Sequence, residues 1–327
     1  MNRVRNLLAA VAALAAAVCS TEGVAHAFCR TTTIPVVADF QPTRERCWDQ
    51  GQPLFWRNSC VGYSIQKSVS RQISYDAAAD GASRAFTKWT GASCPTEGTG
   101  RSRASIDVRD LGPVECAKIG YEQNAANQNV IIFRDDAWPH DGSGNTIALT
   151  TVTFSPDTGE IYDADIEINT FERRITLTDP VPPDGYDYYS VLTHEAGHFL
   201  GLAHSGDDRA TMYFEYRQGN TSMRNLTSDD VAGVCAVYRA DGARAVLNGK
   251  VTPGPQCDPT PRRGFTRECG APPETGCSGS SSSIAPGKVA GDTPTSSTPG
   301  LGLGLGLGIT AMVVARRRVH RRRAPRS

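Results

Sequence analysis

The residues best suited to chemistry lie close together in one short stretch. Residues 194–204 read HEAGHFLGLAH. On a helix, His194 and His198 lie one turn apart on the same face, so both imidazoles can bind one zinc ion with Glu195 beside them. Gly201 can adopt the left-handed conformation that ends a helix, which lets the chain turn back and bring His204 in as a third ligand. Three protein ligands leave one position of a tetrahedral zinc open, a pattern typical of a catalytic site.

The open position predicts a hydrolytic reaction. Glu195 is placed to accept a proton from a water molecule at that position and so to act as a general base. The alternative is the chance occurrence of two histidines and a glutamate on a surface helix. The third histidine and the glycine, at the spacing that a closing turn requires, argue against chance.

The first residues predict export. Arg3 and Arg5 precede an apolar run, and Ala25-His26-Ala27 offers small residues for cleavage. This order is typical of a secretory signal peptide, so we expect residues 1–27 to be removed. Residues 28–50 then form a short N-terminal extension tied by disulfides, without a recognisable cysteine-switch prodomain.

The cysteines suit an oxidising compartment. Nine of the ten cysteines lie after the expected signal peptide, and an odd number leaves one unpaired. We expect a local disulfide between Cys257 and Cys269, and Cys277 as the unpaired cysteine. Fifteen connectivities remain open for the other six, which are Cys29, Cys47, Cys60, Cys94, Cys116 and Cys235.

The C-terminal part changes composition three times. Residues 241–299 are rich in Pro, Ser and Gly and predict a flexible stalk, residues 300–315 are apolar, and residues 316–327 are rich in Arg. A Cys-containing motif, an apolar run and an Arg-rich end resemble the MYXO-CTERM sorting tag of myxobacterial surface proteins. The resemblance implies an extracellular or cell-surface protein of a bacterium, with a membrane tether before processing. The alternative is a low-complexity tail that ends in a basic patch for nucleic acid or phosphate.

The charge distribution argues against nucleic acid as a partner. Between Phe28 and Pro299 there are 25 basic and 33 acidic residues, a net charge of −8. Such a surface repels phosphates and suits calcium. The candidate calcium ligands are Asp157, Asp163, Asp165 and Glu167; a solvated face on an exposed strand is the competing interpretation of the last three.

One domain, residues 51–240, must position these groups. Alternating and helical apolar patterns predict strands over 54–65, 104–108 and 130–133, a hairpin of strands 147–154 and 161–168, and a helix over 75–89. A second helix over 188–201 carries the histidines. A last helix begins at a cap, Thr227 or Ser228, and runs to about Tyr238.

The order of these elements, the histidine stretch and the downstream Thr211-Met212-Tyr213 resemble the metzincin zinc peptidases and, among them, the matrixins. The resemblance implies an α+β fold: a twisted mixed β-sheet with an active-site helix and a C-terminal helix. It implies that Met212 lies in a Met-turn beneath the metal and that Tyr216 lines the primed-side substrate pocket, with Phe214 in place of the usual proline. We expect no second, structural zinc ion, because residues 150–165 lack the histidines that hold one in vertebrate matrixins.

The resulting prediction is a secreted or surface-tethered zinc-dependent endopeptidase that acts on peptide or protein substrates. We expect strand 147–154 to be an open edge that pairs with extended substrate. The competing hypotheses are a catalytically idle surface binding module that retains the fold, and a different zinc hydrolase. Retention of Glu195 beside all three histidines favours the enzyme, since a binding module has no need of a base.

Overall fold

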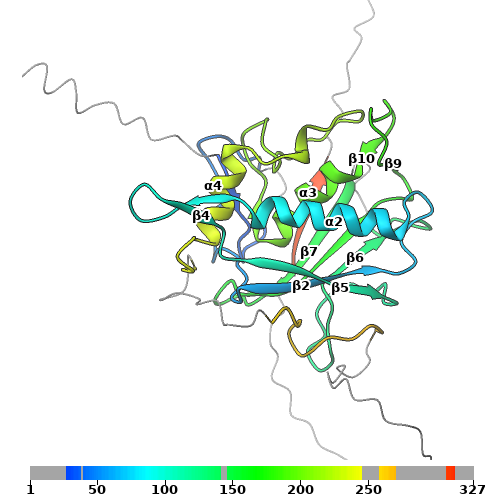
Figure 1. Cartoon of the computed structure of the whole chain (residues 1–327), viewed down its shortest axis with the longest axis horizontal. Coiled ribbons are helices and arrows are strands. Elements are labelled where there is room, and N and C mark those ends of the chain that lie inside the picture. Colours follow the sequence, from blue (N-terminus) through cyan, green and yellow to red (C-terminus); the bar gives the residue numbers. More distant parts are fainter. Residues whose placement is uncertain (1–26, 38–39, 141–145, 245–257, 270–306, 314–327) are drawn as a thin grey trace, which may run out of the picture.

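The computed structural model describes residues 27–37, 40–140, 146–244, 258–269 and 307–313 (Figure 1). The expected signal peptide up to His26, Cys257, Cys277 and the Arg-rich tail therefore lie outside the described residues. Within the described ranges, a twisted mixed β-sheet, three α-helices and one 3-10 helix make up an α+β domain, as predicted.

The sheet has the strand order β12-β7-β8-β6-β2-β5. Four strands run parallel, and β7 and β12 each run antiparallel to their neighbour. The strands are β2 (Cys60–Gln66), β5 (Asp107–Val114), β6 (Val130–Phe133), β7 (Thr146–Phe154), β8 (Ile161–Ile168) and β12 (Leu307–Val313). The predictions for β6, β7 and β8 are confirmed.

Two strands were predicted at the wrong residues. The first begins at Cys60 and not at Leu54, because the buried segment before it joins the β7–β8 turn instead. There Phe55 N–H donates to the Gly159 carbonyl and Ile161 N–H donates to the Phe55 carbonyl. The strand predicted over 104–108 lies at Asp107–Val114. An apolar stretch is thus not sufficient to place a strand, because Leu54, Phe55 and Trp56 are all buried in the segment that precedes β2.

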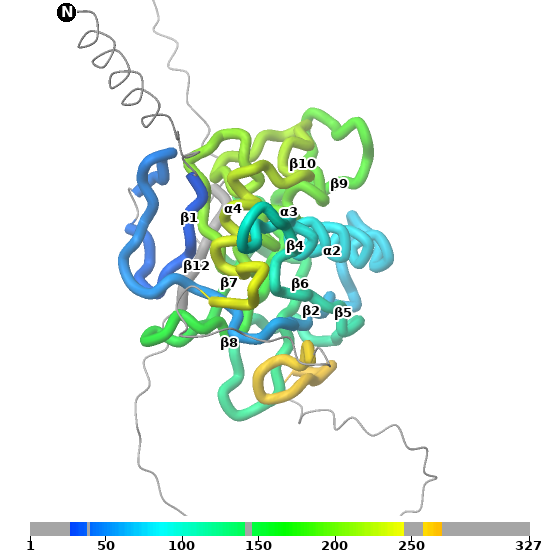
Figure 2. The backbone as a smooth tube through the Cα atoms, turned by 60° about the vertical axis from the view of Figure 1, so that its left-hand side comes forward, coloured from blue at the N-terminus to red at the C-terminus, as the bar shows by residue number. Residues whose placement is uncertain are grey.

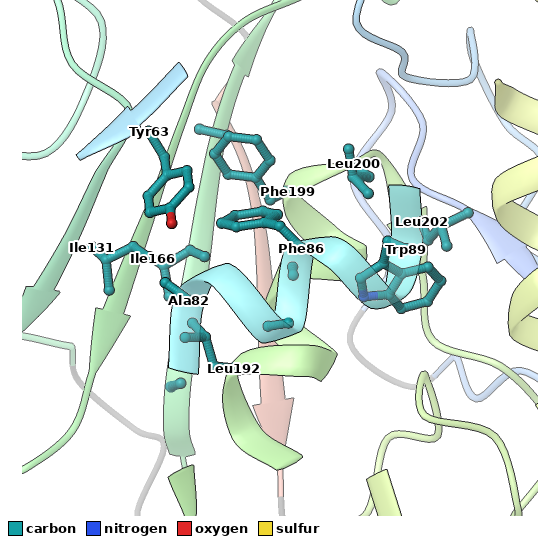
Figure 3. Close-up of a cluster of buried hydrophobic side chains, with 14 of the residues drawn as sticks. Tyr63, Ala82, Phe86, Trp89, Ile131, Ile166, Leu192, Phe199, Leu200 and Leu202 are labelled. Atoms are coloured by element: carbon teal, nitrogen blue, oxygen red, sulfur yellow. The ribbon is translucent and has the colours of Figure 1, made fainter. Parts of the chain in front are cut away.

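Helices α2 (Tyr75–Thr90) and α3 (Tyr188–Phe199) cover one face of the sheet (Figure 1). The predicted apolar face of α2 is confirmed, and Phe86 packs between Tyr63 of β2 and Phe199 of α3 (Figure 3). Gly81 allows the two helices to approach, since a Cβ there would lie 2.3 Å from the Tyr188 ring. The sheet and α2 thus pack against α3 and fix its position.

The other described elements are shorter than α2 and α3. They are β1 (Cys29–Arg30), β3 (Ser93–Pro95), β4 (Arg101–Arg103), β9 (Ile175–Thr176), β10 (Tyr186–Asp187), β11 (Leu202–Ala203), the 3-10 helix η1 (Ser222–Arg224) and α4 (Ser228–Val237). Of the two caps that the sequence left open, Thr227 is the one that caps α4, and the Asp230 side chain completes a capping box with it. Asp187 caps α3 by accepting a hydrogen bond from the Ser190 N–H.

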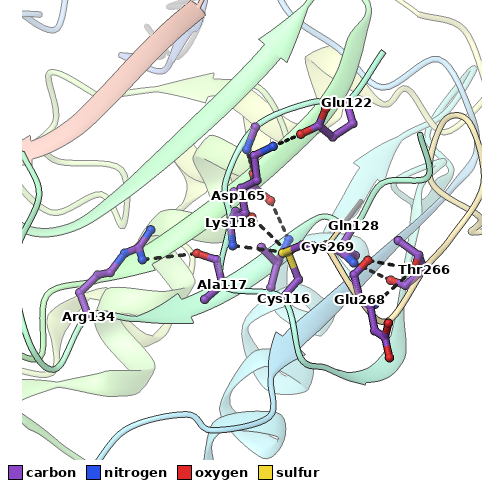
Figure 4. The surroundings of a disulfide bond; sticks show 12 residues. Cys116, Ala117, Lys118, Glu122, Gln128, Arg134, Asp165, Thr266, Glu268 and Cys269 are labelled. Carbon is purple, nitrogen blue, oxygen red and sulfur yellow. Dashed lines mark hydrogen bonds and ion pairs between the residues drawn. A yellow bond between two sulfur atoms is a disulfide. The ribbon is translucent and has the colours of Figure 1, made fainter. Parts of the chain in front are cut away.

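Three disulfides connect distant parts of the described chain. Cys29 pairs with Cys47, which ties the N-terminal extension as expected, and Cys94 pairs with Cys235. Cys116 pairs with Cys269 (Figure 4). The predicted local pair of Cys257 with Cys269 is therefore wrong, and the first six cysteines do not pair only among themselves. Cys60 is also disulfide-bonded.

The Cys116–Cys269 bond has a packing reason. Residues 258–269, assigned from composition to the flexible stalk, lie close to β2 and β5 (Figure 2). Gln128 Nε2 donates to the Thr266 carbonyl at 2.6 Å, and Phe265 packs against a small apolar cluster of Val114, Val130 and Ile132. For these twelve residues the prediction of a stalk is wrong, because a Pro-rich segment can still cover a sheet once a disulfide fixes it.

The acidic residues of β8 lie on the sheet face opposite α2 and α3, and they are buried. Asp165 accepts hydrogen bonds from the Gly120 and Val130 N–H groups, and Glu167 is paired with Arg134 and His140. The interpretation of a solvated face is therefore wrong. Asp157 lies apart in an exposed turn. Among the described residues these carboxylates form no group that could hold one ion together, so calcium binding stays a prediction.

The edge of β7 is occupied. Residues Leu307–Val313, from the expected hydrophobic segment, pair with it as β12, with Thr310 opposite Thr150. The expectation of an open edge is therefore wrong for this state of the chain. In the part of the chain that the structure describes, no helix has the length and apolar character needed to cross a membrane.

Asp163 gives a prediction on stability. No described residue donates a hydrogen bond to either of its oxygens. Burial, followed by repulsion from Asp165, raises the pKa of Asp163 well above its ordinary value. Such an acid favours folding below its unfolded pKa of about 4, and this contribution is lost as the pH rises through the raised value. The protonated Asp163 side chain can donate a hydrogen bond to Asp165. In Asp163→Asn the amide stays neutral at every pH and can donate in the same way, so the loss of stability at high pH is removed. We expect the variant to raise Tm by about 2 °C or more near pH 8 and by less near pH 5.

Thermal unfolding of both proteins at the two pH values measures this effect. Asp157→Asn, in the exposed turn, is the matched control and should shift Tm equally little at both. An increase in Tm for Asp163→Asn that is independent of pH, or that is larger near pH 5, would contradict the raised pKa of Asp163.

Candidate metal centre

Three histidines converge beside the sheet. His194 and His198 project from one side of α3, and their Nε2 atoms lie 3.0 Å apart. The His204 ring lies 5.3 Å from the first ring and 4.9 Å from the second, between ring centroids. All three candidate ligand atoms lie within 4.8 Å of one another, the one such group among the described residues. The structure thus brings together the set that the spacing predicted.

The turn after α3 makes this convergence possible. Gly201 has a φ of 88°, the left-handed conformation expected of it. A Cβ at this position would also lie 2.8 Å from the Leu54 carbonyl oxygen. Beyond the turn, β11 pairs with β1, and this pairing sets the direction in which the chain continues to His204.

Hydrogen bonds fix the protonation of the first two rings. His194 Nδ1 lies 2.7 Å from the Thr211 carbonyl oxygen, and His198 Nδ1 lies 2.8 Å from that of Leu202. A carbonyl can only accept, so each Nδ1 carries the proton and donates it. Each Nε2 therefore presents its lone pair to the centre of the group, the arrangement that zinc ligands need.

Burial keeps all three imidazoles neutral. It lowers the pKa of His194 to about 4 and that of His204 to about 3, and it lowers the pKa of His198 well below its ordinary value. Among the described residues, His204 Nε2 has no hydrogen-bond partner. Two facing lone pairs and an orphaned buried nitrogen are unfavourable without a cation. The donor set therefore fits a zinc ion held by three histidines.

Glu195 lies beside this group and is fully buried. Its Oε2 accepts a hydrogen bond of 2.6 Å from the Thr150 hydroxyl of β7, while its Oε1 has no partner in the part of the chain that the structure describes. Burial raises the pKa of Glu195 to about 8, and the bond from Thr150 opposes that rise. A carboxylate with one oxygen held and the other free is suited to accept a proton from a water molecule.

Met212 packs directly under the helix that bears the histidines. A Cβ on Gly197 would lie 2.3 Å from the Met212 sulfur and 2.8 Å from the Trp89 ring. Gly197, the residue directly before the second histidine, therefore lets Met212 and Trp89 approach α3. Sequence analysis did not single out this glycine, because its function depends on what packs against it.

Two aspartates at the start of α4 hold the loop that contains Met212. Asp230 accepts hydrogen bonds from the backbone N–H groups of Thr211 and Met212 at 2.9 and 3.0 Å. Asp229 accepts from the Ser205 hydroxyl at 2.7 Å and from the Phe28 N–H at 2.9 Å. Nothing in the local sequence around either aspartate points to these distant partners.

Tyr216 is buried and not on an open surface. Its exposed fraction is 1%, its ring lies 6.0 Å from that of Tyr186, and its hydroxyl donates to the Asn220 carbonyl. Phe214 is half-buried, with its ring 6.4 Å from the His204 ring. Of the two, Phe214 lies next to the histidine group, and a role for Tyr216 in a substrate pocket stays a prediction.

Comparison with known proteins agrees with this geometry. The chain is 38% identical to human matrix metalloproteinase-20 over 117 residues, which cover 36% of this chain and 22% of that protein. It is 28% identical to matrix metalloproteinase-C of Caenorhabditis elegans over 197 residues, which cover 58% and 30% of the two chains. It is 34% identical to human neutrophil collagenase over 141 residues, covering 42% and 28%.

The chain thus spans less than a third of the length of these relatives. Matrixin homologues are zinc metalloendopeptidases. The matrixin family model matches residues 55–239, which is more than half of the chain and includes every residue of the histidine group. The chain belongs to the matrixin family.

Proposed function

We propose that the protein is a zinc-dependent endopeptidase that hydrolyses peptide bonds in peptide or protein substrates. The observation that carries the proposal is the juxtaposition of three neutral imidazoles with a buried carboxylate that keeps one oxygen free. When bound, zinc supplies the Lewis acidity that polarises a carbonyl and lowers the pKa of a water molecule.

The residues around the centre have separate tasks in this proposal. His194, His198 and His204 hold the ion, with their tautomers set by backbone carbonyls for the first two. Glu195 accepts the proton of the attacking water and passes it to the leaving amine. Met212 supports α3 from below through its contact at Gly197.

Extended substrate would pair with β7. This strand already binds Leu307–Val313 in antiparallel register, which supports its capacity to accept an extended chain. Thr150, which contacts Glu195, lies in the middle of the same strand. A peptide paired at this edge therefore runs past the proposed base, and it must displace β12 to do so.

The alternative function is a surface binding module that retains the fold without catalysis. A binding module has no use for a buried carboxylate with an unpaired oxygen, because such a group destabilises the fold. The presence of Glu195 in that state favours the enzyme.

Substitution of the base tests the proposal. Glu195→Gln should retain zinc and Tm but lower peptide cleavage by about 100-fold to 10,000-fold, because general-base assistance is lost. His204→Ala should lower the zinc content instead. Cleavage of a peptide library, with zinc measured by atomic emission on the same samples, separates the two effects. Wild-type turnover by the glutamine variant at full zinc content would refute the proposed mechanism.

We further propose that the protein is exported to the surface of a bacterium and processed near Cys277. The support is the order of signal-like, stalk-like, apolar and Arg-rich segments in the sequence. Loss of the residues after Cys277 would also remove β12 from the edge of β7. Sorting and exposure of the proposed substrate edge would then occur in one step.

The intact mass of the native protein tests this processing. We expect a chain that begins at Phe28 and ends at or near Cys277, since cleavage at these two points follows from the proposed signals. A mass that includes Ser327, or a disulfide mapped to Cys277, would contradict the proposal.

A further inference from the structure

Thr150 is a polar residue on the apolar face of a strand. Its neighbours on that face of β7, Ala148 and Val152, belong to the hydrophobic core. Thr150 itself is completely buried. A hydroxyl in such surroundings is unfavourable unless it is hydrogen-bonded, so its partner is the reason for its presence.

That partner is the carboxylate of Glu195. The Thr150 Oγ1 lies 2.6 Å from Glu195 Oε2 and 3.3 Å from the Glu195 carbonyl oxygen. The hydroxyl has a single proton, and the contact of 2.6 Å with the carboxylate oxygen is the shorter and therefore the stronger of the two. The proton therefore goes to the carboxylate.

No other donor to this carboxylate exists among the described residues. Oε1 has no protein partner, and Oε2 has only the hydroxyl of Thr150. A glutamate side chain has three rotatable bonds, and one fixed oxygen is enough to choose among its rotamers. Without that bond, no hydrogen bond from the described residues would fix the orientation of the carboxylate.

The donor is placed on a rigid element. Thr150 lies opposite Ile166 in the antiparallel pairing of β7 with β8, the strand next to it in the sheet. The hydroxyl thus takes its position from the sheet, while Glu195 takes its position from α3. Groups that must hold a fixed geometry are most precise on such elements.

We propose that Thr150 is a positioning residue for the reaction: its hydroxyl holds Oε2 of Glu195 and so keeps Oε1 directed at the attacking water. This inference rests on the proposed peptidase function. It assigns to β7 a second task, since the strand that would pair with substrate also orients the base that acts on it.

The test compares Thr150→Val, which keeps the shape of the side chain and removes the hydroxyl, with Thr150→Ser, which keeps the hydroxyl. We expect the valine variant to lower kcat by about 10- to 100-fold, as loss of a hydrogen bond to a charged group does, with KM and zinc content unchanged. The serine variant should recover most of kcat. Thr170→Val removes another buried threonine hydroxyl, in the loop after β8, and should leave kcat unchanged.

A second measurement does not depend on activity. In crystal structures of the full-length variants, the Glu195 carboxylate should keep its orientation in Thr150→Ser and leave it in Thr150→Val. A residue that only packs in the core would change KM, zinc content and Tm together and would leave Glu195 in place.

The outcomes separate the two claims. If the wild-type protein cleaves peptides and the valine variant has normal kcat, or if Glu195 keeps its orientation in that variant, the inference about Thr150 is overturned and the proposed function stands. If no variant and no wild-type sample cleaves any peptide, the proposed function fails, and the crystal structures still decide whether Thr150 orients Glu195.

Discussion

The carboxylate of Asp230 connects the last helix to the histidine centre, and the geometry of the site depends on it. It closes the cap of α4 with Thr227 and binds the backbone of Thr211 and Met212. The Thr211 carbonyl then accepts the Nδ1 proton of His194, which turns the ring nitrogen Nε2 toward the centre. One buried carboxylate thus fixes a helix start, a loop and the tautomer of a ligand, and these groups are far apart in the sequence.

Small residues permit the close contacts on which the rest of the site is built. Gly197 lets Met212 and Trp89 pack against α3, and Gly201 turns the chain so that His204 faces the other two rings. On the opposite side of α3, β7 supplies Thr150 to the carboxylate of Glu195. The helix is therefore held by α2, the sheet and the Met212 loop at once, and its functional side chains have little freedom to move.

The zinc-binding pattern could be read from sequence because its information is local: two histidines one helical turn apart, a glycine and a third histidine need no knowledge of distant contacts. The contacts of Gly197, Asp230 and Thr150 could not be predicted from sequence, because each depends on a partner at least 15 residues away.

The disulfide between Cys116 and Cys269 was missed for the same reason, since composition alone does not show that residues 258–269 cover the sheet. The buried acids of β8 show that an alternating charged pattern does not by itself reveal which side of a strand meets solvent.

The proposal on which the other inferences depend is that His194, His198 and His204 together hold one zinc ion. Zinc K-edge X-ray absorption on the purified native protein tests it most directly. The account predicts one zinc per chain with three imidazole nitrogens at about 2.0–2.1 Å and one light ligand that does not come from the protein. A sulfur ligand at about 2.3 Å, or a signal from only two imidazoles, would contradict the account.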